Sequence, residues 1–331
     1  MATNATAPEH PAVAVAGSRY GTLAGDGRSL LADVKGVVRE ADLALGNLEG
    51  TLGVGGTGKC GAAEGNGRCF SFQAPPAMSS VLGWAGFDVM SLANNHGFDF
   101  GADGRRQTLQ ALKGAGLAST GQPGQITVVE RRGVKVAVIG FAPYPWASDL
   151  LDPVGAAELV RRAEARADVV VVTAHFGAEG TAAAVTPAGG EVHLGEARGD
   201  ARAFSRAVVD AGADLVLGAG PHVLRGIESY KGRLIAHSLG NFAGVRNFSS
   251  AGDLALSGFL SVRLERNGRW RAGWLHSTRL DATGRPSPDP ANAAAAFLAR
   301  RTAEDFPETG VQVRPTGRLL PRPRAGDQGA S

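Results

Sequence analysis

Several apolar runs in this chain stop abruptly at polar residues, and this pattern constrains the possible folds most. Residues 87–92, 169–174 and 214–217 have the length of strands and are largely apolar. Such runs are typical of strands that are buried on both faces of a sheet, between layers of helices. Segments with helical spacing alternate with them, as at 29–40 and 156–167. The alternation predicts an α/β fold with mixed sheets flanked by helices.

The length of the chain, 331 residues, allows one large α/β domain or two small ones. Alternating segments at 254–264 and 270–280 predict antiparallel strands that close the domain. No clear linker divides the chain, so we predict a single domain over residues 12–310. Residues 1–11 and 311–331 are predicted to be flexible tails, because the chain from 311 onward is rich in Pro, Arg and Gly.

The charge pattern argues against nucleic-acid binding. The 34 basic and 31 acidic residues are interspersed, and no basic stripe is interleaved with aromatic residues. No apolar run reaches the roughly 18 residues of a membrane span, so no transmembrane segment is expected. Residues 1–11 lack the basic start and apolar core of a signal peptide. As written, the chain is expected in the cytoplasm, or outside it if the sequence lacks its signal. The oligomeric state stays open.

Of the two cysteines, Cys60 lies within the glycine-rich stretch 53–67 and Cys69 lies just beyond it. A disulfide between them would close a short loop, and two free thiols are the alternative. Oxidised cysteines would favour an exported protein, because reducing compartments keep thiols free. Zinc binding by two lone cysteines is not expected.

Five predicted strands are followed by polar side chains that suit a metal site. These side chains are Asn47 and Glu49, then Asn94, Asn95 and His96, then His175 and Glu179, then His222, and finally Asn241. A single histidine after an apolar strand is usually a structural residue. Five such strand ends in one α/β chain instead predict a shared site at one sheet edge. Imidazole, amide and carboxylate groups are ligands suited to Zn, Mn or Fe.

The motifs at these strand ends resemble those of a known family. Gly-Asn-Leu-Glu-Gly (46–50), Ala-Asn-Asn-His-Gly-Phe-Asp (93–99), Ala-His-Phe-Gly-Ala-Glu (174–179), Pro-His-Val (221–223) and Ser-Leu-Gly-Asn-Phe (238–242) look like the ordered motifs of the CapA family. Its members are associated with poly-γ-glutamate capsule synthesis, and their fold is similar to calcineurin-like metallophosphatases. The resemblance runs from about residue 13 to 264. It implies a four-layer α/β/β/α sandwich.

The resemblance also implies roles for individual residues. Glu49, Asn95, His175 and His222 would ligate one or two divalent transition metal ions (Mn, Zn or Fe). His96 would be the acid that protonates a leaving group, while Asp99 and Glu179 would complete the catalytic set by orienting imidazoles. The side chains assigned to an anionic small-molecule or polymer substrate are Asn47, Asn94, His193, Arg198 and Asn241. For Asn241, pinning a turn is the alternative. The loop with His193 and Arg198 is expected to be either solvated or a cover over the site.

The chain departs from the family pattern at two expected ligand positions. Ser18 stands where the family has a metal-binding aspartate, and Ala219, or Gly220 by a shifted match, stands where it has a histidine. His237 replaces a usual tyrosine, as a compensating group or a tolerated change. Three functions follow from this pattern. The first is a metal-dependent hydrolase or transferase acting on a phosphoester or an amide-linked acidic substrate. The alternatives are a metal-poor assembly component of polymer synthesis or export, and a biosynthetic enzyme with altered chemistry.

Overall fold

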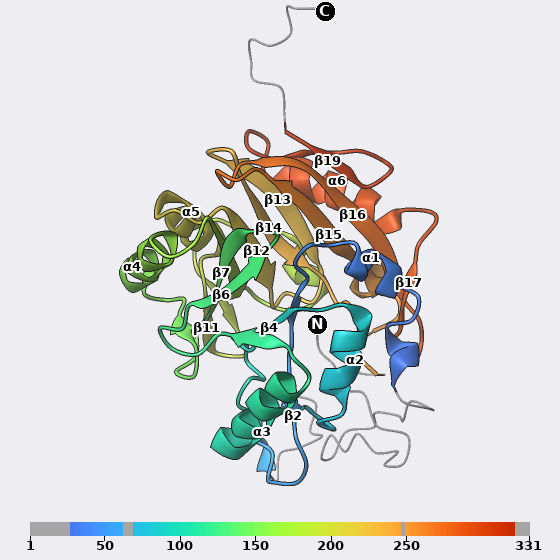
Figure 1. Ribbon diagram of the computed structural model, residues 1–331. Helices are drawn as coiled ribbons and strands as arrows, with labels where there is room; N and C mark the ends of the chain where they lie inside the picture. Colours follow the sequence, from blue (N-terminus) through green and yellow to red (C-terminus); the bar gives the residue numbers. More distant parts are fainter. Residues whose placement is uncertain (1–26, 62–68, 246–248, 322–331) are drawn as a thin grey trace, which may run out of the picture.

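The largest sheet has seven strands and forms the centre of the fold. The computed structural model describes residues 27–61, 69–245 and 249–321 (Figure 1). The strands follow the order β13-β14-β12-β9-β7-β6, and β8 pairs with β7. Strands β7, β9, β12 and β14 are mutually parallel, with antiparallel neighbours at both edges. Their bounds are β6 Thr127–Arg131, β7 Val134–Ala142, β8 Ser148–Asp149, β9 Val169–His175, β12 Leu215–Ala219, β13 Leu224–Tyr230 and β14 Arg233–Leu239.

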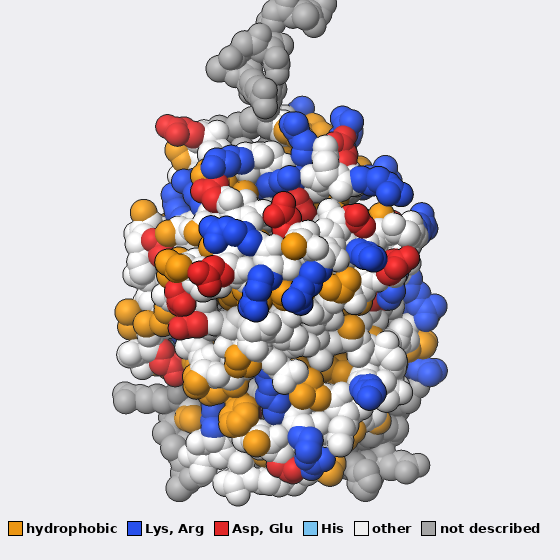
Figure 2. All heavy atoms as spheres, turned by 60° about the vertical axis from the view of Figure 1, so that its left-hand side comes forward, with side chains coloured by type: hydrophobic (Ala, Val, Ile, Leu, Met, Phe, Trp, Pro, Cys, Tyr) orange, Lys and Arg blue, Asp and Glu red, His pale blue; other side chains and the backbone are white. Residues whose placement is uncertain are grey.

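Two helices, α4 (Pro153–Glu164) and α5 (Ala201–Asp210), cover one face of this sheet (Figure 1). Each helix starts at an aspartate, Asp152 or Asp200, whose side chain accepts a hydrogen bond from a backbone N–H of the first turn. Basic and acidic side chains are interspersed on this side of the molecule (Figure 2). Val170 and Val172 of β9 point toward these helices, while Val169 and Val171 point to the other face. The first four residues of β9, all valines, are therefore buried on both faces of the sheet.

A five-stranded antiparallel sheet packs against the other face of the central sheet. Its order is β15-β16-β19-β18, and β17 pairs with β16. Helix α6 (Ala293–Asp305) packs on β13 and β16. Buried apolar side chains from both sheets and α6 form one cluster between them. The strand bounds are β15 Leu256–Leu264, β16 Trp270–Leu280, β17 Pro286–Pro288, β18 Gln312–Val313 and β19 Arg318–Leu320.

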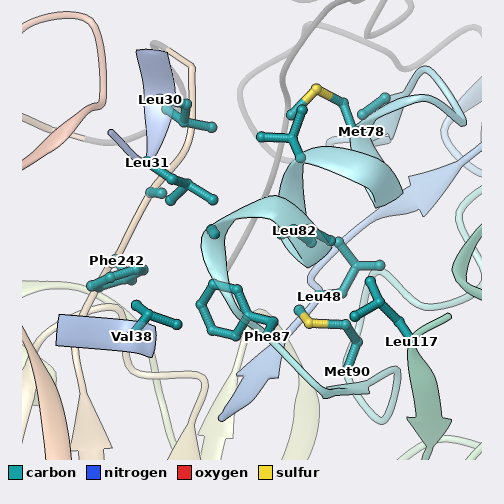
Figure 3. Close-up of a cluster of buried hydrophobic side chains, with 14 of the residues drawn as sticks. Leu30, Leu31, Val38, Leu48, Met78, Leu82, Phe87, Met90, Leu117 and Phe242 are labelled. Carbon is teal, nitrogen blue, oxygen red and sulfur yellow. The ribbon is translucent and has the colours of Figure 1, made fainter. Parts of the chain in front are cut away.

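A small parallel sheet, β1-β4-β5, carries the remaining strand ends of the predicted site. Its core is shown in Figure 3, where Leu82 of α2 and Phe87 face Leu48 and Met90, and Phe242 joins from beyond β14. The elements of this part are η1 Arg28–Leu30, α1 Lys35–Arg39, β1 Leu45–Asn47, β2 Thr51–Leu52, β3 Gln73–Ala74, α2 Met78–Ala85, β4 Val89–Ser91, α3 Gly101–Gly114 and β5 Ala118–Thr120. The short remaining elements are η3 Thr181–Ala184, β10 Glu191–His193, β11 Glu196–Gly199 and η4 Gly252–Ala255.

The predicted α/β class is confirmed, with mixed sheets flanked by helices. The segment 29–40 forms two short helices, η1 and α1, rather than one. No helix in the described ranges is long and apolar enough to cross a membrane. The start of the predicted domain, residues 12–26, lies outside the described residues, as do tail residues 1–11 and 322–331.

The tail predicted to begin at residue 311 is wrong for its first ten residues. Residues 312–313 and 318–320 form β18 and β19, which pair with each other, and β19 also pairs with β16. Val311 and Leu319 are buried in the cluster between the two large sheets. Few apolar side chains are enough to order this segment, because each one packs against an existing core. A count of apolar residues therefore underestimates the order of this segment.

Candidate functional site

The parallel strands bring the predicted side chains to one region. Glu49 follows β1, His96 follows β4, His175 ends β9, and His222 and Asn241 follow β12 and β14. In the small sheet β1 pairs with β4, and in the large sheet β9 pairs with β12, always in parallel. The carboxyl ends of parallel strands share an edge, so their polar residues meet. The two sheets are joined near this edge by a 2.9 Å hydrogen bond between the hydroxyls of Thr173 and Ser91.

Glu49 lies at the centre of the site and is buried. Its Oε1 atom lies 3.4 Å from Nε2 of His222 and 4.0 Å from Nε2 of His175. Its Oε2 atom accepts a 3.1 Å hydrogen bond from Nδ2 of Asn47. Asn47 in turn accepts a hydrogen bond from Nδ2 of Asn94 at 2.9 Å. The carboxylate is therefore held between an amide chain on one side and two imidazoles on the other.

The two histidines that face Glu49 differ in pKa. Burial alone would raise the pKa of Glu49, but the nearby imidazole of His222 and that of His175 hold it well below its ordinary value. Burial acts against a charge on His222 too, yet Glu49 raises its pKa to about 9. Burial lowers the pKa of His175 to about 3. Without a bound cation, the Glu49 carboxylate thus favours the protonated form of His222, whereas burial favours the neutral form of His175, which can act as a metal ligand.

Glu179 connects the strand ends to the hairpin of β10 and β11. Its Oε1 atom accepts hydrogen bonds from Nη2 of Arg198 at 2.8 Å and from Nδ2 of Asn95 at 3.4 Å. Its Oε2 atom lies 3.5 Å from Nε2 of His193 and 3.7 Å from Nε2 of His222. The loop expected to be either solvated or a cover is a β-hairpin, and it places Arg198 in a buried position at the site.

His96 and Asp99 form a buried pair beside Asn95. Nδ1 of His96 lies 2.8 Å from Oδ2 of Asp99, and the backbone N–H of Phe72 donates to the same oxygen at 2.6 Å. Lys59 was missed by the sequence reasoning, although its Nζ lies 2.8 Å from Oδ1 of Asp99. Its position next to Cys60 was the only available signal. The structure joins Cys60 to Cys69 in a disulfide, so the free-thiol alternative does not apply.

Asn241 holds the turn that carries His222. Its Oδ1 atom lies 2.7 Å from Nδ1 of His222, and its Nδ2 donates to the backbone carbonyl of His222 at 3.0 Å. His222 has a φ of 57°, a left-handed conformation that is costly for a residue with a side chain. The side-chain bonds from Asn241 stabilise that conformation and direct Nε2 of His222 toward Glu49.

All the predicted site residues belong to one connected set of contacts. Ala219 pairs with His175 across β12 and β9, so a methyl group occupies the position beside that imidazole. Ser18 lies outside the described residues. His237 is buried, with Nε2 3.2 Å from Oε1 of Glu228 and its ring stacked on Phe306.

The donor atoms of the site fit a cation in their chemistry. Oε1 of Glu49, Oδ1 of Asn95 and Nε2 of His175 are buried, and none has a hydrogen-bond partner among the described residues. Buried polar atoms without partners are rare, and these are the atom types that bind Zn, Mn or Fe. Within the described ranges, however, no group of three or more His, Cys, Asp or Glu side chains is arranged to hold a metal ion. The site therefore has suitable donors in a reduced number.

Comparison with known proteins gives one family and several relatives. The family model for "Bacterial capsule synthesis protein PGA_cap" matches residues 5–245. The PGA biosynthesis protein CapA of Bacillus subtilis is 28% identical over 260 residues, which cover 73% of this chain and 63% of that protein. The capsule biosynthesis protein CapA of Bacillus anthracis is 32% identical over 192 residues, covering 52% and 44%. A probable polyglutamine synthesis accessory protein of Mycobacterium tuberculosis is 29% identical over 231 residues, covering 60% and 55%. The chain thus spans about half to two thirds of these relatives.

Two solved structures are similar at a low level. One is a hypothetical protein from Thermus thermophilus, with a TM-score of 0.42, 17% identity and coverage of 87% of this chain and 96% of that one. The other is a putative 5'-nucleotidase from Staphylococcus aureus in complex with α-ketoglutarate, with a TM-score of 0.42, 12% identity and coverage of 78% and 49%. Scores of this size are too low to transfer a function.

Proposed function

The chain belongs to the bacterial capsule synthesis protein PGA_cap family, and we propose that it is a metal-dependent hydrolase or transferase. Its proposed substrate is a phosphoester or an amide-linked acidic polymer of the poly-γ-glutamate type. The observation that carries the proposal is the buried carboxylate of Glu49 between two imidazoles, with donor atoms nearby that have no partner among the described residues. Named relatives in capsule and PGA biosynthesis support the choice of an acidic polymer.

The residues that would hold the ion are Glu49, Asn95, His175 and His222. Bound there, a divalent transition metal supplies activation of water and neutralises charge on an anionic group. Asn47 supports this set by donating to Oε2 of Glu49, which leaves Oε1 for the ion. Asn241 supports His222 in a similar way: its Oδ1 contacts Nδ1 of His222, which leaves Nε2 of that imidazole for the ion. The supporting amides thus select the donor atom in each ligand.

His96 is the proposed general acid. Asp99 accepts the proton on Nδ1, so this contact fixes the ring orientation and leaves Nε2 for a leaving group. The ring of Phe72 packs against the imidazole with 4.2 Å between ring centroids, which limits its rotation. A single positioned acid of this kind typically contributes about 10²–10⁴-fold in rate.

Arg198 and His193 are the proposed contacts for an anionic substrate. The Arg198 side chain is 3% exposed, and its Nε and Nη1 groups have no hydrogen-bond partner among the described residues. Only Nη2 is engaged, by Glu179 and by Glu196 at 3.4 Å. A buried guanidinium with unused donors suits a carboxylate or phosphate, which accept two parallel hydrogen bonds from it.

A second candidate is a binding or assembly component of polymer synthesis that holds little metal. The methyl group of Ala219 beside His175 favours it, because it removes a ligand position that the family resemblance implies. The lack of a group of three ionisable ligands among the described residues favours it as well. The name of the mycobacterial relative, an accessory protein, is compatible with this role.

Metal content and hydrolysis together separate the two candidates. Purified protein, supplied with Mn or Zn, is assayed on an activated phosphoester and on poly-γ-glutamate, and bound metal is measured by elemental analysis. We expect about one ion or less per chain, and a loss of about 100-fold or more for His96→Ala. His276→Ala, at a histidine in β16 outside the site, is the matched control. No turnover and no retained metal would reject the enzyme in favour of the assembly component.

A gain-of-function variant tests the depleted ligand positions. Ser18→Asp combined with Ala219→His restores the two side chains that the family resemblance implies. We expect the double variant to retain more metal per chain than the wild type. Equal and full occupancy in both proteins would show that the ligand assignment is wrong.

The disulfide also supports a proposal about the compartment. Disulfides persist in oxidising environments and are rare in the reducing cytosol. We therefore propose that the chain works outside the cytoplasm. Detection of the reduced form of Cys60 and Cys69 in intact cells would contradict this.

A further inference from the structure

Two arms of a loop closed by the disulfide converge on the His96–Asp99 pair. One arm ends at Lys59 and Cys60, the other begins at Cys69 and reaches Phe72, and the disulfide joins them over a sequence separation of 9. The backbone N–H of Cys60 also donates to the hydroxyl of Ser71 at 3.4 Å. The arms are thus linked by a covalent bond and by a hydrogen bond beside it.

Each arm makes direct contacts with the segment from Asn95 to Asp99. Nζ of Lys59 lies 2.8 Å from Oδ1 of Asp99 and donates to the backbone carbonyl of Asn95 at 2.9 Å. The backbone N–H of Lys59 donates to the carbonyl of Asp99 at 2.7 Å. From the other arm, Phe72 donates its N–H to Asp99 and packs its ring on His96. The loop therefore holds both ends of this segment.

The charge of Asp99 makes the lysine more than a packing element. The Asp99 side chain is fully buried, and an ionised carboxylate in that position needs an opposite charge nearby. Lys59 provides this charge while its own side chain remains 34% exposed. With Oδ1 engaged by Lys59, Oδ2 is directed to Nδ1 of His96. The contact thus determines which oxygen of Asp99 meets the imidazole.

We infer that Lys59 is a positioning residue for the His96–Asp99 pair, and that the Cys60–Cys69 disulfide holds Lys59 in place. The inference rests on the proposed function only for its effect on rate. Nζ of Lys59 also lies 3.4 Å from Nδ1 of His96, which is not the nitrogen left for a leaving group. Lys59 therefore acts on the imidazole from its Nδ1 side and through Asp99, and it acts through the carbonyl of Asn95 on a proposed ligand. The disulfide thus becomes part of the support of the site.

The first test reads the imidazole directly and does not require turnover. Nitrogen NMR of ¹⁵N-histidine-labelled protein without added metal reports the protonated Nδ1 of His96, and His96→Gln assigns the signal. We expect Lys59→Met to shift or broaden this signal and Lys59→Arg to restore it, because arginine keeps the charge. Lys113→Met, at an exposed lysine of α3, is the control. An unchanged signal in Lys59→Met would overturn the inference.

The second test addresses the disulfide. The double substitution Cys60→Ser and Cys69→Ser should change the His96 signal in the same direction as Lys59→Met. Adding Lys59→Met to that variant should change the signal little further, since both act through the same contact. A disulfide variant with a wild-type His96 signal would overturn the supporting role of the disulfide.

The third test links the inference to the reaction. If the protein hydrolyses the activated phosphoester, Lys59→Met should lower kcat about 10–100-fold, as expected for loss of a group that orients a catalytic residue. KM should stay within about twofold, and Lys59→Arg should recover most of kcat. A change in KM alone would assign Lys59 to substrate binding instead. Absence of any wild-type turnover would reject the proposed function, and the His96 signal would still decide the role of Lys59.

Discussion

Removal of Arg225 is expected to destabilise the protein strongly, since this residue is a fully buried cation of β13. Its Nη1 and Nη2 donate to the two carboxylate oxygens of Glu191 at 2.8 and 2.7 Å, and Nε donates to the carbonyl of Ala183 at 2.6 Å. Glu191 also accepts a hydrogen bond from the N–H of Ala178 at 3.1 Å. The pair fastens the β10–β11 hairpin, with His193 and Arg198, to the central sheet.

The size of the effect follows from the burial of both partners. Removing one member of a buried ion pair leaves an uncompensated charge and costs about 3–5 kcal/mol. We expect Arg225→Met and Glu191→Leu each to lower the free energy of unfolding by that amount. The double variant leaves no buried charge, but the N–H of Ala178 and the carbonyl of Ala183 lose a partner, at about 1–2 kcal/mol each. Its expected loss of about 2–4 kcal/mol is less than half the sum of the single losses.

The assay is a double-mutant cycle in urea, monitored by tryptophan fluorescence. The matched control is the exposed pair Arg132–Asp42, where the same cycle should show little coupling. Amide hydrogen exchange should show faster opening of 191–199 in the single variants, because the hairpin loses its anchor. Additivity of the two single variants within about 0.5 kcal/mol would refute the reasoning, because it would mean that the charges do not compensate each other.

Three further substitutions test other parts of the structure, each by urea unfolding. Gly177→Ala should destabilise by about 1–3 kcal/mol, because φ is 82° and a Cβ atom would lie 2.6 Å from Nη1 of Arg225. Leu319→Ala should lower the free energy of unfolding by about 2–5 kcal/mol, because Leu319 of β19 is buried in the core. An unchanged free energy of unfolding would instead support the predicted flexible tail. Burial would raise the pKa of Glu228, but hydrogen bonds, first that from His237, lower it from 4.5 to about 2. The ionised Glu228 carboxylate thus contributes about 3 kcal/mol to the free energy of unfolding above pH 4.5, and this contribution is lost as the pH falls toward 2. The difference in free energy of unfolding between the wild type and Glu228→Gln should therefore narrow from pH 7 to pH 3.

The strand-end residues could be predicted from the sequence because their positions depend on a general rule. Glu49, His175 and His222 each follow an apolar run, and parallel strands bring such positions together whatever the loops do. The contacts of Asn241 could be anticipated in part, since a short polar side chain after a strand often stabilises a turn. The apolar pattern thus carried both the fold class and the location of the site.

The residues that support the site could not be predicted in this way. Arg225 lies in a strand that mixes polar and apolar residues, and its partner Glu191 lies in a segment with no strand pattern. Lys59 meets Asp99 across 40 positions of sequence, through a loop whose course depends on a disulfide that the sequence left open. Leu319 is buried by a pairing with β16 that adds only a few residues. In each case the deciding interaction is a single long-range contact, which has no local pattern.

Substitutions at the strand ends and substitutions at the supporting contacts should disturb the site in different ways. Glu49, His175 and His222 are carried by strand ends, so changes there act on the proposed metal position while the core stays packed. Two fastening points matter for Lys59 and Arg198: the disulfide for the loop that carries Lys59, and the Arg225–Glu191 pair for the β10–β11 hairpin that carries Arg198. Loss of either point leaves the strands in place, so it should displace one functional group and spare the others. Variants of the two fastenings should therefore affect His96 and Arg198 separately, and a variant that disturbs both groups at once would place its effect in the sheets.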